Sequence, residues 1–377
     1  MLAFFLMSGN LLAIPGLALP TQSQWVVAIL AAMFAMMPIL LVRASYEIFW
    51  ALAATAVFGF FIYTAPAVPI STAYSSIKAN KVLIIFAFCV LLPIILIRSE
   101  RHLRFFFRIY IFISLVVVAA AATQLGSLSQ ERLILGEDGN PIWLARAAGF
   151  VVVYFTLLYI NKKVPFWLTA ACGGISLLVV FATGSRGPFL ALLIALVLSI
   201  VGRRRGGYLF NGKLLLIGGA LGLAALGTVL FASEWVDRVW SLEDSGRLGL
   251  YQLALEAIFA EPSGIGVGGF STLGYFDYPH NLILETVVEL GWLAGGVAVI
   301  GLVYCWKRLV RIKFISIETQ ILYALFIYAF VNSMFSGDMA SAKELYLTAA
   351  LGFVLSRRQT ALSEMWGPRK THLNKIA

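Results

Sequence analysis

Apolar runs of about 20 residues recur along the whole chain, and this recurrence constrains the fold more than any single motif does. Hydrophobic residues make up 61% of the 377 positions, and the mean hydropathy is +0.91. Soluble domains are only about half apolar. Because the bilayer core holds no water, each crossing must satisfy its own backbone hydrogen bonds as a helix. The sequence therefore predicts an all-α, polytopic membrane protein.

We expect about twelve transmembrane helices, and no internal repeat or low-complexity linker divides them. Residues 1–377 are thus expected to form a single integral membrane domain. Two of the runs are short for a crossing and could instead be tilted re-entrant segments, namely 188–202 and 344–356. The expected spans are 2–19, 25–42, 47–65, 82–97, 105–124, 142–160, 165–182, 188–202, 214–232, 283–305, 317–335 and 344–356.

Basic residues gather in alternate connections, as the positive-inside rule requires of correctly placed spans. One set of segments, which includes both chain ends, holds 20 of the 28 lysines and arginines. Both termini are therefore expected in the cytoplasm. The net charge of +10 follows from this orientation signal, so we expect no nucleic-acid partner. The three cysteines fall inside apolar runs, so no disulfide framework or metal-ligand spacing is present.

The longest extramembrane segment covers 233–282 and is expected outside the cytoplasm. Within it, Arg247–Phe259 is predicted to form an amphipathic helix that lies on the bilayer and acts as a lid. Its expected apolar face consists of Leu248, Tyr251, Leu255 and Ile258. A loop with four glycines follows, at 264, 266, 268 and 269, and allows close approach to another backbone or to a ligand.

Two arginines on the same predicted side stand where a simple structural role does not require a cation. Arg186 lies at a hairpin tip, in the sequence Thr-Gly-Ser-Arg-Gly-Pro, and guanidinium suits phosphate oxygens. A tight turn alone would explain the other residues there. Arg247 opens a helix, where the positive end of the helix dipole disfavours a cation. Either it pairs with Glu243 or Asp244, or it meets an anionic ligand.

His280 is the candidate general base, because an unperturbed imidazole titrates near neutral pH and can remove a proton from a sugar hydroxyl. His102 and His372 lie in basic segments that are expected in the cytoplasm. Capping of the following membrane helix is the structural alternative for His280. Glu285 and Glu289 share a helix face just beyond it.

These two carboxylates could orient the imidazole or receive one of three arginines, Arg146, Arg186 and Arg247. Arg146 stands four residues into the predicted span 142–160. It could either bind substrate or extend to the nearby interface, and the second account is the simpler one.

The order and spacing of these motifs resemble the bacterial O-antigen ligase and O-antigen polymerase superfamily, over the second half of the chain. The resemblance implies a GT-C-type glycosyltransferase with twelve helices and a periplasmic helical loop. Such enzymes transfer a glycan from undecaprenyl diphosphate to an acceptor hydroxyl at the periplasmic face. The motifs are Thr183 to Gly187, Gly246-Arg247 with Tyr251 and Pro262, the glycine loop ending at Phe270, Pro279-His280-Asn281 with Leu284, Glu285, Glu289 and Gly291, and Asn332 with Ser336-Gly337-Asp338.

The same resemblance implies roles for individual residues. Arg186 and Arg247 would hold the diphosphate leaving group, and His280 would deprotonate the acceptor for inverting attack. Substrate contacts are expected from Arg186, Arg247, Glu285, Glu289, Arg146 and Asn281. No metal, nucleotide or other cofactor is implied.

The periplasmic loop is compact compared with that of typical ligases, which favours polymerisation of polysaccharide repeat units. The acceptor would then be another lipid-linked repeat unit, and a chain-length regulator would be a possible partner. Ligation to lipid A core is the alternative. A lipid-linked glycan flippase is a more distant one, because transporters usually place ionisable groups near the bilayer midplane. In each case the expected location is the bacterial inner membrane.

Overall fold

The computed structural model describes residues 2–14, 31, 46–65, 72–125, 132–136, 139–200, 247–274 and 276–365. Within these ranges every regular element is a helix, which confirms the all-α prediction. The α-helices are α1 (Leu2–Leu12), α3 (Tyr46–Thr64), α4 (Thr72–Leu96), α5 (Glu100–Ala122), α6 (Pro141–Ile160), α7 (Phe166–Ala182), α8 (Arg186–Ile200), α11 (Arg247–Ala260), α12 (Leu282–Ile312), α13 (Ile317–Phe335) and α14 (Lys343–Met365). Two short 3-10 helices are η2 (Gly269–Thr272) and η3 (Met339–Ser341).

Six of the described helices are long and apolar enough to cross a membrane, namely α3, α4, α5, α6, α12 and α13. Helices α1, α7 and α8 are apolar but shorter. Two expected spans, 25–42 and 214–232, lie outside the described residues, and 2–19 is described only to residue 14. The structure thus shows a multi-pass architecture without confirming the count of about twelve.

Several helix boundaries differ from those expected. Helix α4 begins at Thr72, ten residues before the expected start at 82, and α14 runs well past the expected end at 356. Hydropathy places a boundary where polar side chains begin, whereas the helical backbone continues until its hydrogen bonds end. In α4 the polar extension contains Lys78, which is buried against partners on α12.

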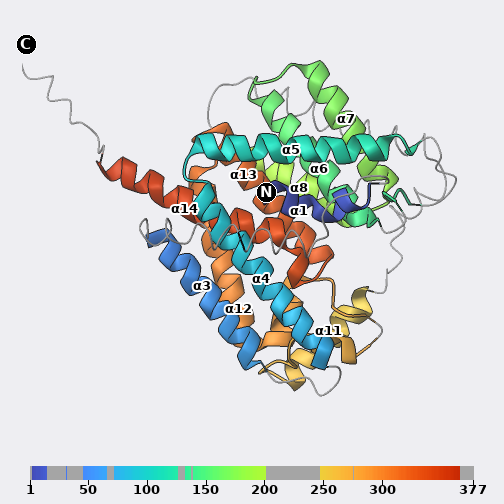
Figure 1. Ribbon diagram of the computed structural model, residues 1–377, viewed down its shortest axis with the longest axis vertical. Coiled ribbons are helices and arrows are strands. Elements are labelled where there is room, and N and C mark those ends of the chain that lie inside the picture. The colour runs from blue at the N-terminus through green and yellow to red at the C-terminus, as the bar shows by residue number, and fades with distance from the viewer. Residues whose placement is uncertain are drawn as a thin grey trace, which may run out of the picture.

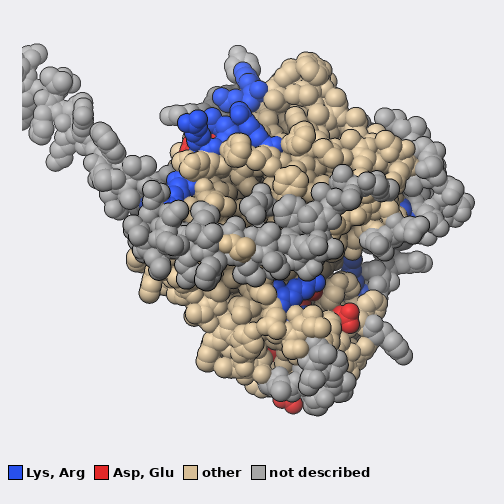
Figure 2. Space-filling model, viewed as in Figure 1, with Lys and Arg blue, Asp and Glu red and all other residues tan. Residues whose placement is uncertain are grey.

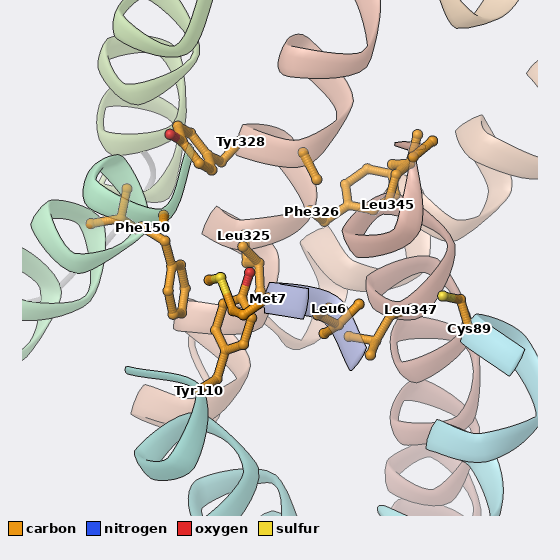
Figure 3. Close-up of a cluster of buried hydrophobic side chains, with 14 of the residues drawn as sticks. Leu6, Met7, Cys89, Tyr110, Phe150, Leu325, Phe326, Tyr328, Leu345 and Leu347 are labelled. Carbon is orange, nitrogen blue, oxygen red and sulfur yellow. The ribbon is translucent and has the colours of Figure 1, made fainter. Parts of the chain in front are cut away.

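The main core is one cluster of buried apolar side chains that joins α1, α3, α4, α5, α6, α7, α8, α12, α13 and α14. Figure 3 shows its centre, where Met7 of the short helix α1 lies among Tyr110, Phe150 and Leu325. The rings of Tyr110 and Phe150 have centroids 4.8 Å apart. This packing fixes the position of α13, around whose C-terminal end the candidate site is built.

Helices α3, α4 and α12 lie side by side below α5 in Figure 1, with α11 at the far end of this group. A second apolar cluster joins α3 and α4 to α14, and a third joins α11 to α12. In Figure 2, basic side chains gather over the N-terminal part of α5, far from α11 in this view. That segment is one of those expected to face the cytoplasm.

Candidate functional site

The three residues expected to carry the chemistry all stand at the N-terminal ends of helices. Arg186 is the first residue of α8, Arg247 is the first residue of α11, and His280 precedes α12 by two positions. Each helix start presents free N–H groups and a partial positive charge. An anionic ligand bound there would meet a guanidinium group and a helix start together.

His280 is held in an unusual conformation. Its φ of 57° lies in the left-handed region, which residues other than glycine seldom adopt. The imidazole packs edge-on against Tyr278, with ring centroids 4.6 Å apart, and against Phe276 at 5.9 Å. Its Nδ1 atom is buried and makes no hydrogen bond to the described part of the chain. Buried polar atoms are usually hydrogen-bonded, so this nitrogen has the capacity to bond to a ligand.

The electrostatic surroundings of His280 favour the neutral base. Burial lowers the pKa of the imidazole, the charge of Arg247 lowers it further, and Asp338 raises it. Arg247 and Asp338 are therefore both near enough to act on the ring. Arg247 was expected as a site residue that holds the diphosphate, whereas Asp338 was not expected in the site. The only sequence signal for it was the similarity of Ser336-Gly337-Asp338 to the superfamily.

Asn281 joins α12 to α13. Its Oδ1 accepts the N–H groups of Ile283 and Leu284, each at 3.1 Å, and so caps the start of α12. Its Nδ2 donates to the main-chain carbonyl of Met334 at 3.2 Å. Both ends of the amide are thus used in structural bonds, while substrate binding by Asn281 remains a prediction.

The main-chain carbonyl of Met334 is a shared hydrogen-bond acceptor for segments of the candidate site. It also accepts the hydroxyl of Tyr251, one turn after Arg247, at 3.4 Å. The next residue, Phe335, lies so close to Gly187 that a Cβ there would be 3.1 Å from the phenylalanine Cβ. The segments that carry Arg186, Arg247 and His280 therefore surround the C-terminal end of α13.

The two glutamates have a partner that sequence analysis missed. Nζ of Lys78 lies 2.8 Å from Glu285 and 2.6 Å from Glu289, and all three side chains are at most 4% exposed. These carboxylates therefore receive a lysine where an arginine had been expected, while their contact with the imidazole or with substrate remains a prediction. Lys78 had been assigned to a loop, because hydropathy alone cannot show that a lysine will be neutralised by carboxylates on another helix.

The same carboxylates tie α4 and α12 to the turn that carries Asp338. Oε2 of Glu285 accepts the N–H of Met339 at 2.8 Å. The carbonyl of Met339 accepts the hydroxyl of Tyr346 at 2.8 Å. The buried triad of Lys78, Glu285 and Glu289 therefore helps to position Asp338 near the imidazole.

The glycine loop fits into a break in α12, which confirms the expected close backbone approach. Gly291 has φ 87° and ψ 172°, so the helix kinks there. A Cβ on Gly291 would lie 2.6 Å from the carbonyl oxygen of Ser263, and one on Gly264 would lie 2.6 Å from that of Glu289. The N–H of Gly266 donates to the carbonyl of Glu289 at 3.0 Å. Two glycines thus let the loop and α12 pair their backbones.

Helix α11 confirms the predicted helix after Arg247, and the face that it buries in the protein is largely different from the one expected to lie on the bilayer. The residues packed against α12 and the glycine loop are Leu250, Ala254, Ala257 and Ile258. Leu248 and Leu255, which were expected on the apolar face, are exposed. Helix α11 carries apolar residues on more than one face. The small alanines of the buried face allow this face to pack closely against α12. Contact of the exposed leucines with the bilayer remains a prediction.

Arg146 does not extend to an interface as expected. Its Nη2 donates to the carbonyl and the hydroxyl of Ser336, both at 2.8 Å, and to the carbonyl of Asn332 at 3.3 Å. The guanidinium thereby satisfies free carbonyls at the end of α13, as cations at helix C-termini do. It also lines a cavity of about 70 Å³ together with Tyr110 and Glu344.

Arg132 is a further residue that sequence analysis did not single out. Its Nε donates to the carbonyl of Thr183 at 2.9 Å, and its Nη2 donates to the hydroxyl of Ser185 at 3.1 Å. It therefore holds the turn directly before Arg186. An arginine in a connection carries no sequence signal of such a distant contact.

Apolar helices of membrane-spanning length, and a histidine and two arginines at helix starts around one helix end, define the class: a multi-pass helical membrane protein with a candidate anion-binding site. Residues 171–300 match the family model described as O-antigen ligase. This match covers Arg186, Arg247 and His280, and it confirms the resemblance to the O-antigen ligase and polymerase superfamily. No curated protein matches the chain at a significant level.

Proposed function

We propose that this protein is a membrane glycosyltransferase that transfers a glycan from undecaprenyl diphosphate to a hydroxyl of an acceptor saccharide at the periplasmic face. The observation that carries the proposal is the unpartnered, buried ring nitrogen of His280 beside the charge of Arg247. The family match over the same residues supports it.

In the proposed reaction His280 takes the proton from the acceptor hydroxyl. The hydroxyl oxygen then forms a bond to the anomeric carbon, while the bond from that carbon to the diphosphate breaks. The lipid diphosphate leaves with the electron pair, and attack from the opposite side inverts the anomeric centre. Arg186 and Arg247, together with the helix starts that carry them, would stabilise the developing negative charge.

Polymerisation of polysaccharide repeat units is the activity that we propose first. Its support is the compact segment between α11 and α12, in which the glycine loop lies against α12 and leaves little chain to accommodate a large acceptor. Ligation to lipid A core is the second candidate, and the description of the matching family favours it.

One reconstitution separates these two activities. The purified full-length protein is incubated with an undecaprenyl-diphosphate-linked oligosaccharide, first alone and then with lipid A core. A ladder of products from the donor alone indicates a polymerase, and a single transfer that requires lipid A core indicates a ligase. Failure of both reactions, with a donor of matching repeat structure and folded protein, would contradict the proposal.

The placement of the buried charges supports the flippase alternative less well than it supports a glycosyltransferase. Glu285 is the fourth residue of α12, and Glu289 is the eighth of 31. These charges therefore lie near the helix start, on the side of His280, whereas transporters usually place such groups near the bilayer midplane.

A further inference from the structure

An apolar groove runs along α12, and residues of the main core such as Leu290 and Ala294 form part of its lining. It has a volume of about 710 Å³ and is lined by α3, α4, α12 and α14. Along α12 it extends from Leu282, next to the candidate site, to Arg308. At 1.5 Å per residue these positions are roughly 35–40 Å apart, which is comparable to the thickness of a bilayer.

The lining of the groove includes the aromatic side chains of Phe58, Phe86 and Phe353 as well as small residues. The α12 lining includes Gly301, and a Cβ added there would meet no atom within 4 Å. Nearly the whole lining is apolar, except at the end of the groove that is far from His280. Such a surface fits one or more hydrocarbon chains.

Two arginines stand at the end of the groove that is far from His280. The guanidinium of Arg357 lies 3.9 Å from the ring centroid of Tyr46, and that of Arg308 lies 5.1 Å from the ring centroid of Tyr304. Arg308 also donates to the Tyr304 hydroxyl at 2.7 Å. In the part of the chain that the structure describes, neither arginine forms an ion pair with a carboxylate.

We propose that this groove binds an anionic phospholipid, with its phosphate on Arg308 and Arg357 and an acyl chain between α3 and α12. Two half-buried guanidinium groups, each oriented by a tyrosine, offer paired donors to phosphate oxygens. Basic sites between membrane helices are suited to anionic headgroups. The bound lipid belongs to the leaflet opposite to the one near His280, so it is distinct from the glycan donor.

The position of the cations decides between this lipid and the donor. A donor placed for reaction would have its diphosphate near His280 and would leave Arg308 and Arg357 without an anion. A phospholipid of the other leaflet satisfies both arginines and fills the same apolar space from the far end. This inference does not depend on the proposed enzymatic function.

The test is a lipid titration of the purified full-length protein, followed by native mass spectrometry. Phosphatidylglycerol and phosphatidylcholine with identical acyl chains are compared. We expect the wild-type protein to bind phosphatidylglycerol about tenfold more tightly, as one net charge-assisted contact would give. Arg308→Gln combined with Arg357→Gln should remove this preference. The Lys pair at the same positions, which keeps the charge but loses the planar fork, should retain part of it.

Two matched controls distinguish the groove from general effects. Arg311→Gln removes an exposed arginine of the same helix that does not line the groove and should leave the preference intact. Gly301→Leu fills the groove and should weaken the binding of both lipids. Gly296→Leu adds the same side chain to open space outside the groove and should not.

Three results would overturn the proposal. The first is an unchanged preference for phosphatidylglycerol in the folded double Gln variant. The second is equal loss of lipid from the Gly301 and Gly296 variants. The third is displacement of phosphatidylglycerol by a polyprenyl phosphate that binds the double Gln variant as tightly as the wild type. That result would assign the groove to the glycan donor. Thermal unfolding of every variant shows whether the protein is folded.

Discussion

Nζ of Lys78 lies 2.6 Å from Oε1 of Glu289, and this pair is buried between α4 and α12. The same amine lies 2.8 Å from Glu285. A buried charge that loses its partner costs several kcal/mol, because its desolvation is no longer offset. The contact therefore links α4 directly to the start of α12, beside the candidate site.

Replacement of Lys78 by Met should destabilise the protein by about 3–5 kcal/mol, since it leaves two carboxylates buried without a cation. Thermal unfolding in detergent measures the change. Lys81→Met, on the same helix but exposed, is the matched control and should have little effect. The triple variant that also carries Glu285→Gln and Glu289→Gln should recover part of the loss. A Lys78→Met protein as stable as the wild type would show that the triad does not hold these helices together.

His280→Ala should reduce glycan transfer by about 10²–10⁴-fold, the usual contribution of a general base. The amount of folded protein in the membrane should not change. His102→Ala provides the comparison, because that histidine is exposed on α5. Product ladders or ligated products are compared on gels. Equal products from the His280 variant and the wild type would remove the imidazole from the mechanism.

The pH dependence of transfer should reflect the environment of His280. A general base works in its neutral form, so activity falls as the pH drops through the imidazole pKa. Burial and Arg247 lower this pKa below its ordinary value, so activity should persist below the pH at which a free histidine becomes charged.

Asp338→Asn removes the charge that raises the pKa of His280, and it should move the acid limb of the rate profile to lower pH. Asparagine can still accept the N–H of Ser341, as Asp338 Oδ1 does at 2.9 Å. The turn should therefore stay intact. A shift to higher pH would contradict the placement of Asp338 beside the ring.

Arg186→Lys tests whether the planar guanidinium, and not only its charge, stabilises the leaving diphosphate. A lysine keeps the charge but cannot form two parallel hydrogen bonds to phosphate oxygens. We expect kcat to fall by about 10²–10³-fold, as when one donor to a developing anion is lost. Arg101→Lys on the exposed face of α5 should have no such effect. Retained activity would reduce Arg186 to a general counter-charge.

Gly291→Ala should destabilise the protein by about 1–3 kcal/mol, because residues other than glycine are strained at positive φ. The added Cβ would also approach the carbonyl oxygen of Ser263 to 2.6 Å and displace the glycine loop. Gly296→Ala, in open space on the same helix, should be neutral or slightly stabilising. Similar unfolding temperatures for the two variants would argue against the backbone pairing at Gly291.

The positions of the helices and turns around the candidate site follow largely from local sequence, because hydropathy and turn residues determine structure within a few positions along the chain. The helices around Arg186, Arg247 and His280 begin where polar residues give way to apolar runs. The glycine loop was expected to approach another backbone, and it does so at Gly291.

The partners of charged residues could not be predicted, because they depend on which helices become neighbours. Lys78 and Glu289 are separated by 211 positions, and no local pattern joins them. Arg146 likewise meets Ser336 through the packing of α6 against α13. The face of α11 that packs against α12 could not be predicted either, since helical spacing cannot rank two faces that are both apolar.

The bonds at Met334 involve its main-chain oxygen and not its side chain. Every amino acid supplies that atom, so exchanging residue 334 for another helix-compatible one would leave the docking of Tyr251 and Asn281 in place. Variation of the side chain at position 334 therefore need not disturb these two bonds, and a comparison of related sequences would not reveal the atom on which Tyr251 and Asn281 meet.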